Sequence, residues 1–395
     1  MTSTTTLSNT LGLDAATDRL WDAVVVGAGP AGALAARQLA TAGVRVLLVD
    51  KKVFPRPKVC GACLNGQALS VLRSVGLGSL ASQLGAITPE FLQIGVRGRS
   101  ARFPLPEGLV LSRSRLDTAL VEAAVAAGAD LLQETQAAVE PAQGATRSTR
   151  LTHLGVTTPI HAKLVLVAAG IGNTCLDRAE RVRTRIADSA RIGAGTVLDE
   201  FPAAYREPAI FMAVGRAGYV GLVRTEDGRL NVAAALDKGI IKRCGGPGEA
   251  ASLILSEAGC IPIPALASTP WQGTPGLTRR TRPIAEHRLF LLGDATGYVE
   301  PFTGEGMAWA LASGQAIAPL ALQGIDDWHP ALERAWSRLH GRLVARRQTV
   351  CRGMATVLRH PWLSRVVFAT ATRIPATARI LMQRVNSPPV PLETS

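Results

Sequence analysis

Short apolar runs alternate with helical stretches along the chain. Residues 23–26, 44–49, 164–167 and 288–292 are apolar almost throughout and rich in β-branched side chains. Such runs are typical of strands that are buried on both faces, as in a parallel sheet covered by helices. A helical segment at 33–42 separates the first two runs. The pattern predicts an α/β fold with a Rossmann-like sheet.

Other segments alternate apolar and polar residues. The segment 91–103 does so throughout, as expected for a hairpin. Further along, Asp227-Gly228 is a signal for a type I′ hairpin turn, with arms expected at 219–223 and 229–233. These segments predict a β-rich unit that is separate from the first sheet.

Helical periodicity marks further segments. Asn65 is of a residue type that caps helices, and we expect a helix from about 66 to 75. The periodicity also predicts helices over 249–258 and 307–322, and a mostly helical chain from Asp326 onward.

The strand at 23–26 runs directly into a glycine motif. Gly27, Gly29 and Gly32 have the spacing G-x-G-x-x-G, and the next predicted strand ends on Asp50. The first glycine allows a tight turn, the second lets the backbone approach a pyrophosphate, and the third lets helix and strand pack closely. The helix N-terminus favours phosphate, and Asp50 can accept hydrogen bonds from ribose hydroxyls. The chain therefore contains one complete dinucleotide-binding unit.

The composition fits a soluble α/β enzyme, with 47% hydrophobic and 18% charged residues, and excludes a disordered chain. There is no apolar run of about 18 residues, so no membrane-spanning helix is expected. Residues 1–20 are rich in Thr and Ser and lack the apolar core of a secretory signal, so we expect a disordered lead. Six scattered cysteines do not suggest a disulfide framework, and the expected compartment is the cytoplasm.

The net charge of +13 is concentrated near the C-terminus. Residues 334–384 contain eleven arginines and no Lys, Asp or Glu. Because aromatic and aliphatic residues such as Trp362 and Phe368 lie between these arginines, the segment can lie along the inner, anionic face of a membrane. A basic helical cover over the core and a dimer contact remain alternatives, and the oligomeric state stays open. Nucleic-acid binding is not expected.

Cys60 and Cys63 form a C-x-x-C pair, which can be redox-active or bind a metal. A zinc site needs about four ligands, and no second Cys or His pair has a suitable spacing, so no metal is predicted. We interpret the pair as part of a small-residue turn that lies against a cofactor. Arg113 precedes a helical segment, where its side chain can meet a phosphate or remain solvated.

Two motifs, GAGPAG with Asp50 and GDATGYVEPFTGEG near 293–306, resemble the FAD-dependent oxidoreductases with the p-hydroxybenzoate hydroxylase fold. FPRPKVCGACL and PFTGEGMAWALASG look most like the geranylgeranyl reductase branch. The resemblance implies a Rossmann-like FAD-binding domain of the glutathione-reductase type, an inserted β-rich substrate domain and a C-terminal helical segment. The expected boundaries are 1–20 for the lead; 21–90, 109–185 and 280–325 for the FAD-binding domain; 91–108 and 186–279 for the substrate domain; and 326–395 for the basic helical segment.

The resemblance also implies roles for residues at matching positions. The glycine motif would hold the FAD pyrophosphate, Asp50 the adenosine ribose and Asp294 the ribityl chain. Backbone amides at 304–306, at a helix N-terminus, would stabilise the charge of a reduced flavin. The cofactor-binding residues expected in this way are Gly27, Gly29, Pro30, Ala31, Gly32, Asp50, Lys51, Lys58, Cys60, Gly61, Arg113, Gly293, Asp294, Pro301, Gly304, Glu305 and Gly306.

We therefore expect an FAD-dependent reductase or dehydrogenase acting on a hydrophobic, isoprenoid- or polyketide-like substrate. A flavin-dependent monooxygenase that uses NAD(P)H and O2 is the first alternative, and a non-catalytic lipid-binding escort of the same fold is the second. NAD(P)H is also a candidate transient electron donor for the reductase. The sequence assigns no general acid or base, and Cys60, Tyr219 and Glu305 are candidates by position only.

Overall fold

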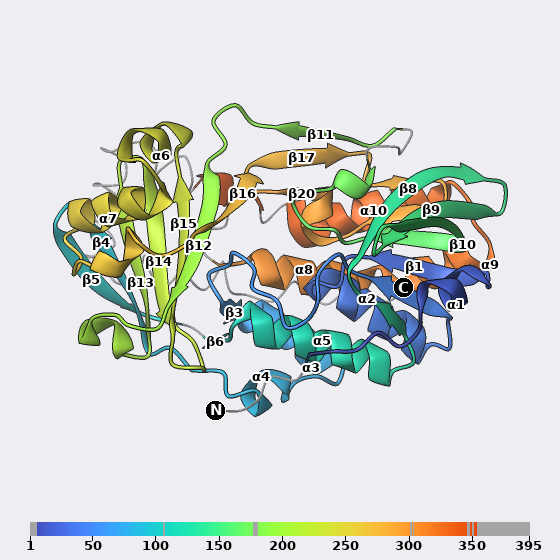
Figure 1. Cartoon of the computed structure of the whole chain (residues 1–395), viewed down its shortest axis with the longest axis horizontal. Helices are drawn as coiled ribbons and strands as arrows, with labels where there is room; N and C mark the ends of the chain where they lie inside the picture. Colours follow the sequence, from blue (N-terminus) through green and yellow to red (C-terminus); the bar gives the residue numbers. More distant parts are fainter. Residues whose placement is uncertain are drawn as a thin grey trace.

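The computed structural model describes residues 6–105, 107–176, 181–300, 302, 304–345, 348–349 and 351–353. Figure 1 shows two bodies side by side, with a helix-covered sheet on the right and a second sheet on the left. We call the first body the parallel-sheet domain and the second the seven-stranded sheet.

The parallel-sheet domain is built on a sheet with the strand order β18-β19-β10-β1-β2-β7. Five of these strands, from β19 to β7, are parallel to their neighbours. This arrangement matches the sheet that the apolar runs predict. The bounds are β1 (Trp21–Val26), β2 (Val46–Val49), β7 (Asp130–Leu132), β10 (Val156–Val167), β18 (Ala285–Glu286) and β19 (Leu289–Leu291).

Helices cover the sheet because its strands are apolar on both faces. Val24 and Val25, which are adjacent on β1 and point to opposite faces, are both fully buried. β8 (Thr135–Gln143) and β9 (Thr146–His153) extend the sheet as an antiparallel ribbon beside β10. The helices of this domain are α1 (Leu13–Thr17), α2 (Pro30–Thr41), α3 (Gly66–Ser74), α4 (Leu80–Gln83), α5 (Arg113–Ala126), α8 (Gly306–Ala316), α9 (Ala318–Asp326) and α10 (Ala331–His340).

The seven-stranded sheet has the order β16-β12-β15-β14-β13-β4-β5. α6 (Lys238–Cys244) and α7 (Pro247–Ala258) cover its outer face (Figure 1). Its strands are β4 (Phe91–Val96), β5 (Arg99–Pro104), β12 (Ile192–Leu198), β13 (Ala209–Gly215), β14 (Gly218–Arg224), β15 (Leu230–Leu236) and β16 (Gln272–Gly276). Two small sheets complete the described fold, formed by β3 (Cys63–Asn65) with β6 (Gly108–Val110) and by β11 (Arg183–Ile186) with β17 (Arg279–Arg282) and β20 (Gly297–Tyr298).

The N-terminal lead is ordered from residue 6, so the expectation of a disordered segment over 1–20 is wrong for its described part. The Leu7 amide donates to the carbonyl of Phe54, and the Thr10 amide donates to the carbonyl of Leu131. Ala16 on α1 is fully buried in the core of the parallel-sheet domain. The sequence missed this packing because Thr- and Ser-rich composition does not reveal backbone partners on distant parts of the chain.

The hairpin at Asp227-Gly228 pairs as predicted, but its turn does not have the predicted type. Gly221 on β14 pairs with Ala233 on β15. The connecting loop spans five residues, from 225 to 229, and only Gly228 in it has a positive φ, of 81°. A type I′ turn needs positive φ at both central residues. Here a wider turn closes with the Gly228 amide donating to the Thr225 carbonyl.

The C-terminal segment is helical over its first part, as predicted. On α10, Trp336 is fully buried and its indole Nε1 donates to the Leu291 carbonyl at 3.0 Å. Arg334, Arg338 and Arg342 are exposed on the opposite side. The expected membrane-surface segments from Trp362 onward lie outside the described residues. Among the described helices, none is both long and apolar enough to cross a membrane.

Candidate functional site

The turn from β1 to α2 is shaped by contacts that leave no room for side chains. Gly27 has a φ of +101°, and a Cβ there would lie 2.5 Å from the Ala168 carbonyl oxygen. A Cβ at Gly32 would lie 1.8 Å from the Gly27 carbonyl oxygen. The two glycines thus let α2 begin directly against β1. At Gly29 the surroundings are open, because the nearest atoms to such a Cβ are guanidinium nitrogens of Arg56 and Arg113 at 3.8 Å.

The N-terminus of α2 is left without a side-chain cap. Gly29 is the N-cap residue, Pro30 follows as the first helical residue, and the first turn, which includes Ala31 and Gly32, contains no acidic side chain. The first amides of a helix need an acceptor, and the helix dipole favours an anion at this end. Two guanidinium groups therefore face an uncapped helix end, and this arrangement can hold a pyrophosphate.

Asp50 lies at the end of β2 and is 7% exposed. Its Oδ2 accepts from the Ala28 amide at 2.8 Å and lies 3.5 Å from Nη2 of Arg56, while its Oδ1 accepts from the Lys52 amide at 2.9 Å. The carboxylate thus fixes the glycine loop through the Ala28 amide. Lys51, also expected to contact the cofactor, is exposed beside it.

Arg113 is buried and ion-paired, which excludes the solvated alternative. Its Nε and Nη2 donate to the two carboxylate oxygens of Asp117, one turn along α5, at 2.7 Å each. Burial alone would lower the pKa of Arg113, but Asp117 and the neighbouring Cys60 thiol outweigh it and the pKa is raised. Arg56 also approaches Asp117, at 3.6 Å. Sequence reasoning missed Arg56 and Asp117, although an Arg and an Asp four residues apart on one helix was an available signal.

Lys58 and Asp294 face each other across the same region. Burial, with Arg113 nearby, lowers the pKa of Lys58. Burial raises the pKa of Asp294, although Lys58 and Arg113 act in the opposite direction. A Cβ at Gly170 would lie 3.2 Å from the Lys58 ammonium nitrogen, which places Lys58 beside the end of β10. Gly293, next to Asp294, has a positive φ and donates its amide to Ser313 Oγ.

Cys60 and Cys63 are free thiols, with Cys60 on the loop that leads into β3 and Cys63 the first residue of β3. Cys63 Sγ donates to the Gly61 carbonyl at 3.0 Å, and burial raises the pKa of Cys63 to about 12. A Cβ built on Gly61 would meet nothing within 4 Å, whereas one on Gly304 would lie 3.5 Å from the Cys63 Cβ. The structure therefore places Cys63 against Gly304, just before α8, and leaves the space beside Gly61 open.

Glu305 precedes α8 as its N-cap residue, but its side chain makes no capping hydrogen bond. The side chain is buried, and Oε2 accepts from Cys351 Sγ at 2.8 Å. The carboxylate is therefore engaged by the C-terminal segment. Gly306 is the first residue of α8, and Pro301 lies outside the described residues.

A second buried charge cluster lies where the seven-stranded sheet meets the parallel-sheet domain. Arg191 and Glu300 are each 1% exposed, and Arg191 Nη1 donates to Glu300 Oε1 at 2.9 Å. Arg191 also lies over the ring of Tyr219, 5.9 Å from its centroid. Burial raises the pKa of Tyr219 well above its usual range, and the neighbouring Glu300 carboxylate raises it further. Burial has the same effect on Tyr298. Sequence reasoning found Tyr219 but missed Arg191 and Glu300.

Tyr219 belongs to an apolar face of the seven-stranded sheet. Alternate residues of β4 and β13 pack on this face, together with Ile171, Tyr298 and Phe302 from the parallel-sheet domain. Tyr219 meets Phe302 edge to face, with ring centroids 5.1 Å apart. The strand residues of this face are Leu92, Ile94, Val96, Ile210, Met212 and Val214. An apolar wall with one phenol beside a buried carboxylate can bind a hydrophobic molecule and hold a proton close to it.

Buried polar atoms left without a partner support a bound dinucleotide in the parallel-sheet domain. Among the described residues, Arg56 Nε, Asn173 Oδ1 and Arg279 Nη2 have no hydrogen-bond partner within the protein. Native structures leave few such atoms unpaired. Arg56 lies beside the glycine turn, because its guanidinium approaches Asp50. Asn173 and Arg279 lie near Asp294: Asn173 donates to the Ala295 carbonyl, and the charge of Arg279 acts on the pKa of Asp294. The described residues therefore fit a cofactor that extends from the α2 N-terminus towards α8.

The fold and this site define a dinucleotide-binding protein of the α/β class. The chain belongs to the family described as FAD binding domain, whose model matches residues 21–318. It is an FAD-dependent oxidoreductase.

Two of the similar proteins are named as reductases. The menaquinone reductase of Mycolicibacterium smegmatis is 26% identical, with 89% of this chain and 88% of that protein covered. The digeranylgeranylglycerophospholipid reductase of Thermoplasma acidophilum is 23% identical, with 81% and 83% covered. Conditioned medium factor receptor 1 of Dictyostelium discoideum is 25% identical over 77% of this chain, which spans only 64% of that protein. Among solved structures, the flavin-dependent brominase Bmp2 has a TM-score of 0.77 at 17% identity, with 95% and 96% of the chains covered, and shows the shared fold.

Proposed function

We propose that the protein is an FAD-dependent reductase that adds hydrogen across a carbon–carbon double bond of a hydrophobic, isoprenoid-type substrate. The observation that carries this proposal is the apolar face around Tyr219, where a phenol is held beside the buried Arg191–Glu300 pair. The similarity to proteins named menaquinone reductase and digeranylgeranylglycerophospholipid reductase supports the substrate class. The proposal specifies the substrate and the reaction. The assignment as an FAD-dependent oxidoreductase stands without it.

The proposed residue roles follow from what such a reduction requires. Reduced FAD, when bound, supplies a hydride to one carbon of the double bond. The other carbon must take a proton, and we assign this proton to the Tyr219 hydroxyl. A tyrosine phenol is protonated at neutral pH, so the proton is present when substrate binds. Arg191 contacts both Glu300 and the half-exposed Asp237, at 2.9 and 3.0 Å, and its positive charge would stabilise the Tyr219 phenolate until a proton from solvent restores the phenol.

A product assay tests this function directly. The FAD-loaded enzyme is photoreduced under anaerobic conditions and mixed with menaquinone-4 or geranylgeraniol, and the extracted lipid is analysed by mass spectrometry. Gain of two hydrogens in the isoprenoid chain supports the proposal. Absence of reduced product, together with an oxygen-containing product when O2 and NAD(P)H are supplied, would favour the monooxygenase instead. Binding of lipid without any product would favour the escort.

A matched pair of tyrosine variants tests the proton donor. Tyr219→Phe should lower the rate of product formation about 100-fold, within the range that one positioned acid contributes, while substrate affinity changes little. Tyr205→Phe is the control, because Tyr205 is also buried, packs against Phe211 of the seven-stranded sheet, and donates its hydroxyl to the Ile261 carbonyl at 2.7 Å. Equal rates in the two variants would remove Tyr219 from the mechanism.

We also propose that the substrate is collected at a membrane surface. The exposed arginines of α10 extend into the arginine-rich chain that follows, and anionic lipid attracts such segments by about 1 kcal/mol per cation. Sedimentation with phosphatidylglycerol vesicles tests this step. Binding that is lost with phosphatidylcholine vesicles or at high salt supports it, and failure to bind phosphatidylglycerol at low salt contradicts it.

A further inference from the structure

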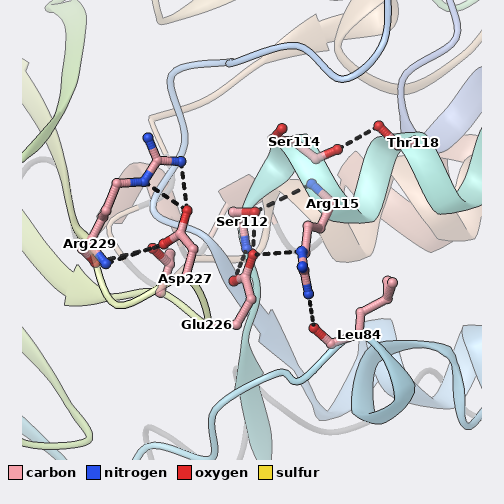
Figure 2. Close-up of polar contacts among 9 residues, drawn as sticks. Leu84, Ser112, Ser114, Arg115, Thr118, Glu226, Asp227 and Arg229 are labelled. Carbon is pink, nitrogen blue, oxygen red and sulfur yellow. Dashed lines mark hydrogen bonds and ion pairs between the residues drawn. The ribbon is translucent and has the colours of Figure 1, made fainter. Parts of the chain in front are cut away.

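The loop between β14 and β15 connects the seven-stranded sheet to the N-terminus of α5 (Figure 2). Glu226 lies at the tip of this hairpin, and its side chain is 2% exposed. The Ser112 amide donates to Glu226 Oε2 at 2.9 Å, and Ser112 Oγ donates to Glu226 Oε1 at 2.6 Å. Ser112 is the N-cap residue of α5, and its Oγ also accepts from the Arg115 amide at 3.3 Å.

Glu226 thus supplies the negative charge that α5 lacks at its own beginning. The first turn of α5 contains no acidic residue. A carboxylate at a helix N-terminus accepts unpaired amides and interacts favourably with the helix dipole. Arg115 adds to the contact, because its Nε lies 3.9 Å from Glu226 Oε1 while its Nη1 donates to the Leu84 carbonyl at 3.0 Å. A carboxylate from the seven-stranded sheet therefore supports the Ser112 cap of a helix in the parallel-sheet domain.

The rest of the hairpin tip is braced by its own contacts. Asp227 accepts from the Arg229 amide and guanidinium and from Thr225 Oγ1, at distances from 2.6 to 3.2 Å (Figure 2). These contacts stay within the loop and do not cross to α5. Asp227 and Arg229 are exposed, whereas Glu226 is directed into the contact with Ser112. The loop therefore presents one carboxylate from a fixed backbone.

The same hairpin contacts the site at a second point. Asn231, on the other arm, donates its Nδ2 to the Cys60 carbonyl at 2.8 Å. Cys60 neighbours Arg113, and Arg113 directly follows Ser112 on α5. One hairpin therefore holds both the loop that carries Cys60 and the helix end that carries Arg113. Its inner-face residues, such as Tyr219, belong to the apolar wall of the proposed substrate site.

From these contacts we infer that Glu226 is a positioning residue for Arg113. By capping α5 it fixes the guanidinium at the cofactor side of the domain interface, and it ties cofactor binding to the placement of the seven-stranded sheet. The inference rests on FAD binding by Arg113, and it does not require the reductase activity proposed above. A measurement of FAD affinity therefore tests it without any turnover, so its failure is distinguishable from failure of the proposed function.

The experiment is a double-mutant cycle on FAD affinity, measured by fluorescence quenching as the apoprotein is titrated with FAD. Glu226→Ala should raise the Kd for FAD about tenfold, which corresponds to about 1.4 kcal/mol. Arg113→Met should raise it at least as much. Because Glu226 acts through Arg113, the double variant should bind FAD no more weakly than Arg113→Met alone. Glu226→Gln keeps an oxygen that can accept from the Ser112 amide, and should recover part of the loss.

Asp227→Ala is the matched control, since it removes contacts within the same loop but none that cross to α5. It should change the Kd for FAD less than twofold. Additive effects of Glu226→Ala and Arg113→Met, or an unchanged Kd in Glu226→Ala, would overturn the inference. A purely structural role would lower the melting temperature without the non-additive FAD affinity. If Arg113→Met does not fold, because Asp117 loses its bidentate partner, the cycle is run with Arg113→Lys, which keeps the charge but not the bidentate contact.

Discussion

At the turn between β1 and α2 the protein packs backbone against backbone, whereas at the approach to α8 it packs ionisable side chains against aromatic rings. The first region depends on the glycines at 27 and 32, where a single added carbon would overlap a carbonyl oxygen. The second depends on Arg191 and Glu300, buried together beside Tyr219. One region excludes side chains, and the other is crowded with them.

The contrast corresponds to two tasks. A pyrophosphate is bound in the same way in many enzymes, so a backbone site with a helix end is sufficient and does not change with pH. Chemistry on a substrate needs groups that carry protons, and these must be buried to act in a medium of low polarity. Burial makes such groups costly. The second region should therefore be the more sensitive to single substitutions and to pH.

The largest expected effect is the removal of one partner from the buried ion pair. Arg191→Met should lower the free energy of unfolding by about 3–5 kcal/mol, because Glu300 is then left buried and charged without its partner. Chemical denaturation followed by tryptophan fluorescence measures this loss. The double variant Arg191→Met, Glu300→Gln is the control and should regain much of the stability, since Asp237, the other partner of Arg191, is half-exposed and no buried charge is left unpaired. Equal stability of the single and double variants would show that burial of the charge is not the cause.

Gly32→Ala tests the backbone-packed region. A Cβ at this position would lie 1.8 Å from the Gly27 carbonyl oxygen and 3.0 Å from the Ala168 side chain, so α2 must shift away from β1. We expect a loss of about 3 kcal/mol, near the upper end for overpacking, and a purified protein without bound FAD. The flavin absorbance relative to protein measures cofactor content. Gly12→Ala is the control, because nothing lies within 4 Å of a Cβ there. Normal FAD content in Gly32→Ala would contradict the role of this close contact.

The backbone-packed region could be predicted because its signals are contiguous. The strand at 23–26, the three glycines and Asp50 fall within thirty residues, and the structure places them as expected. The cap at Asn65 and the helix at 249–258 were also readable from local residue types. Family membership confirms FAD as the cofactor. The individual cofactor contacts remain predictions.

The second region could not be predicted because its members are far apart in the sequence. Arg191 and Glu300 are separated by 109 positions, and nothing near either residue indicates the other. The same holds for Glu226 and Ser112, 114 positions apart. The lead over 6–20 was misjudged for this reason as well, since its partners lie on distant strands. Pairings of this kind follow from tertiary packing, which local propensity does not encode.

The stability of the protein at acid pH should depend on a buried histidine, His340. Burial, with Arg282 nearby, lowers the pKa of His340 from about 6.5 to about 4. His340 is 5% exposed and its Nε2 lies 3.0 Å from Thr296 Oγ1, next to Asp294. Above pH 6.5 the ring is neutral in both the folded and unfolded states and does not affect stability. As pH falls from 6.5 to 4 the unfolded state takes up the proton first, so stability falls by about 2–3 kcal/mol.

Denaturation curves at several pH values measure this slope in the wild type and in His340→Gln. The glutamine variant cannot take up a proton, so the part of the slope between pH 6.5 and 4 that comes from His340 should be missing. Above pH 7 the free energy of unfolding should depend on pH equally in the two proteins. Identical slopes in the two proteins over the acid range would contradict a buried neutral imidazole.

The smallest effect concerns a local contact that lies between the two regions. Asn65 Oδ1 accepts from the Ala68 amide at 3.0 Å and caps α3, which begins directly after Cys63 and β3. Asn65→Ala should cost about 1 kcal/mol, the usual value for loss of a helix cap, and Asn65→Ser should restore most of it because serine can also accept from the amide. Denaturant midpoints measure both. A loss as large as that of Arg191→Met would mean that Asn65 supports more than its helix, and the contrast between local capping and buried charge would fail. A loss near 1 kcal/mol with normal FAD content would show that Asn65 stabilises only its own helix. The larger loss in Arg191→Met would then come from the buried charge, and the contrast between the two kinds of contact would hold.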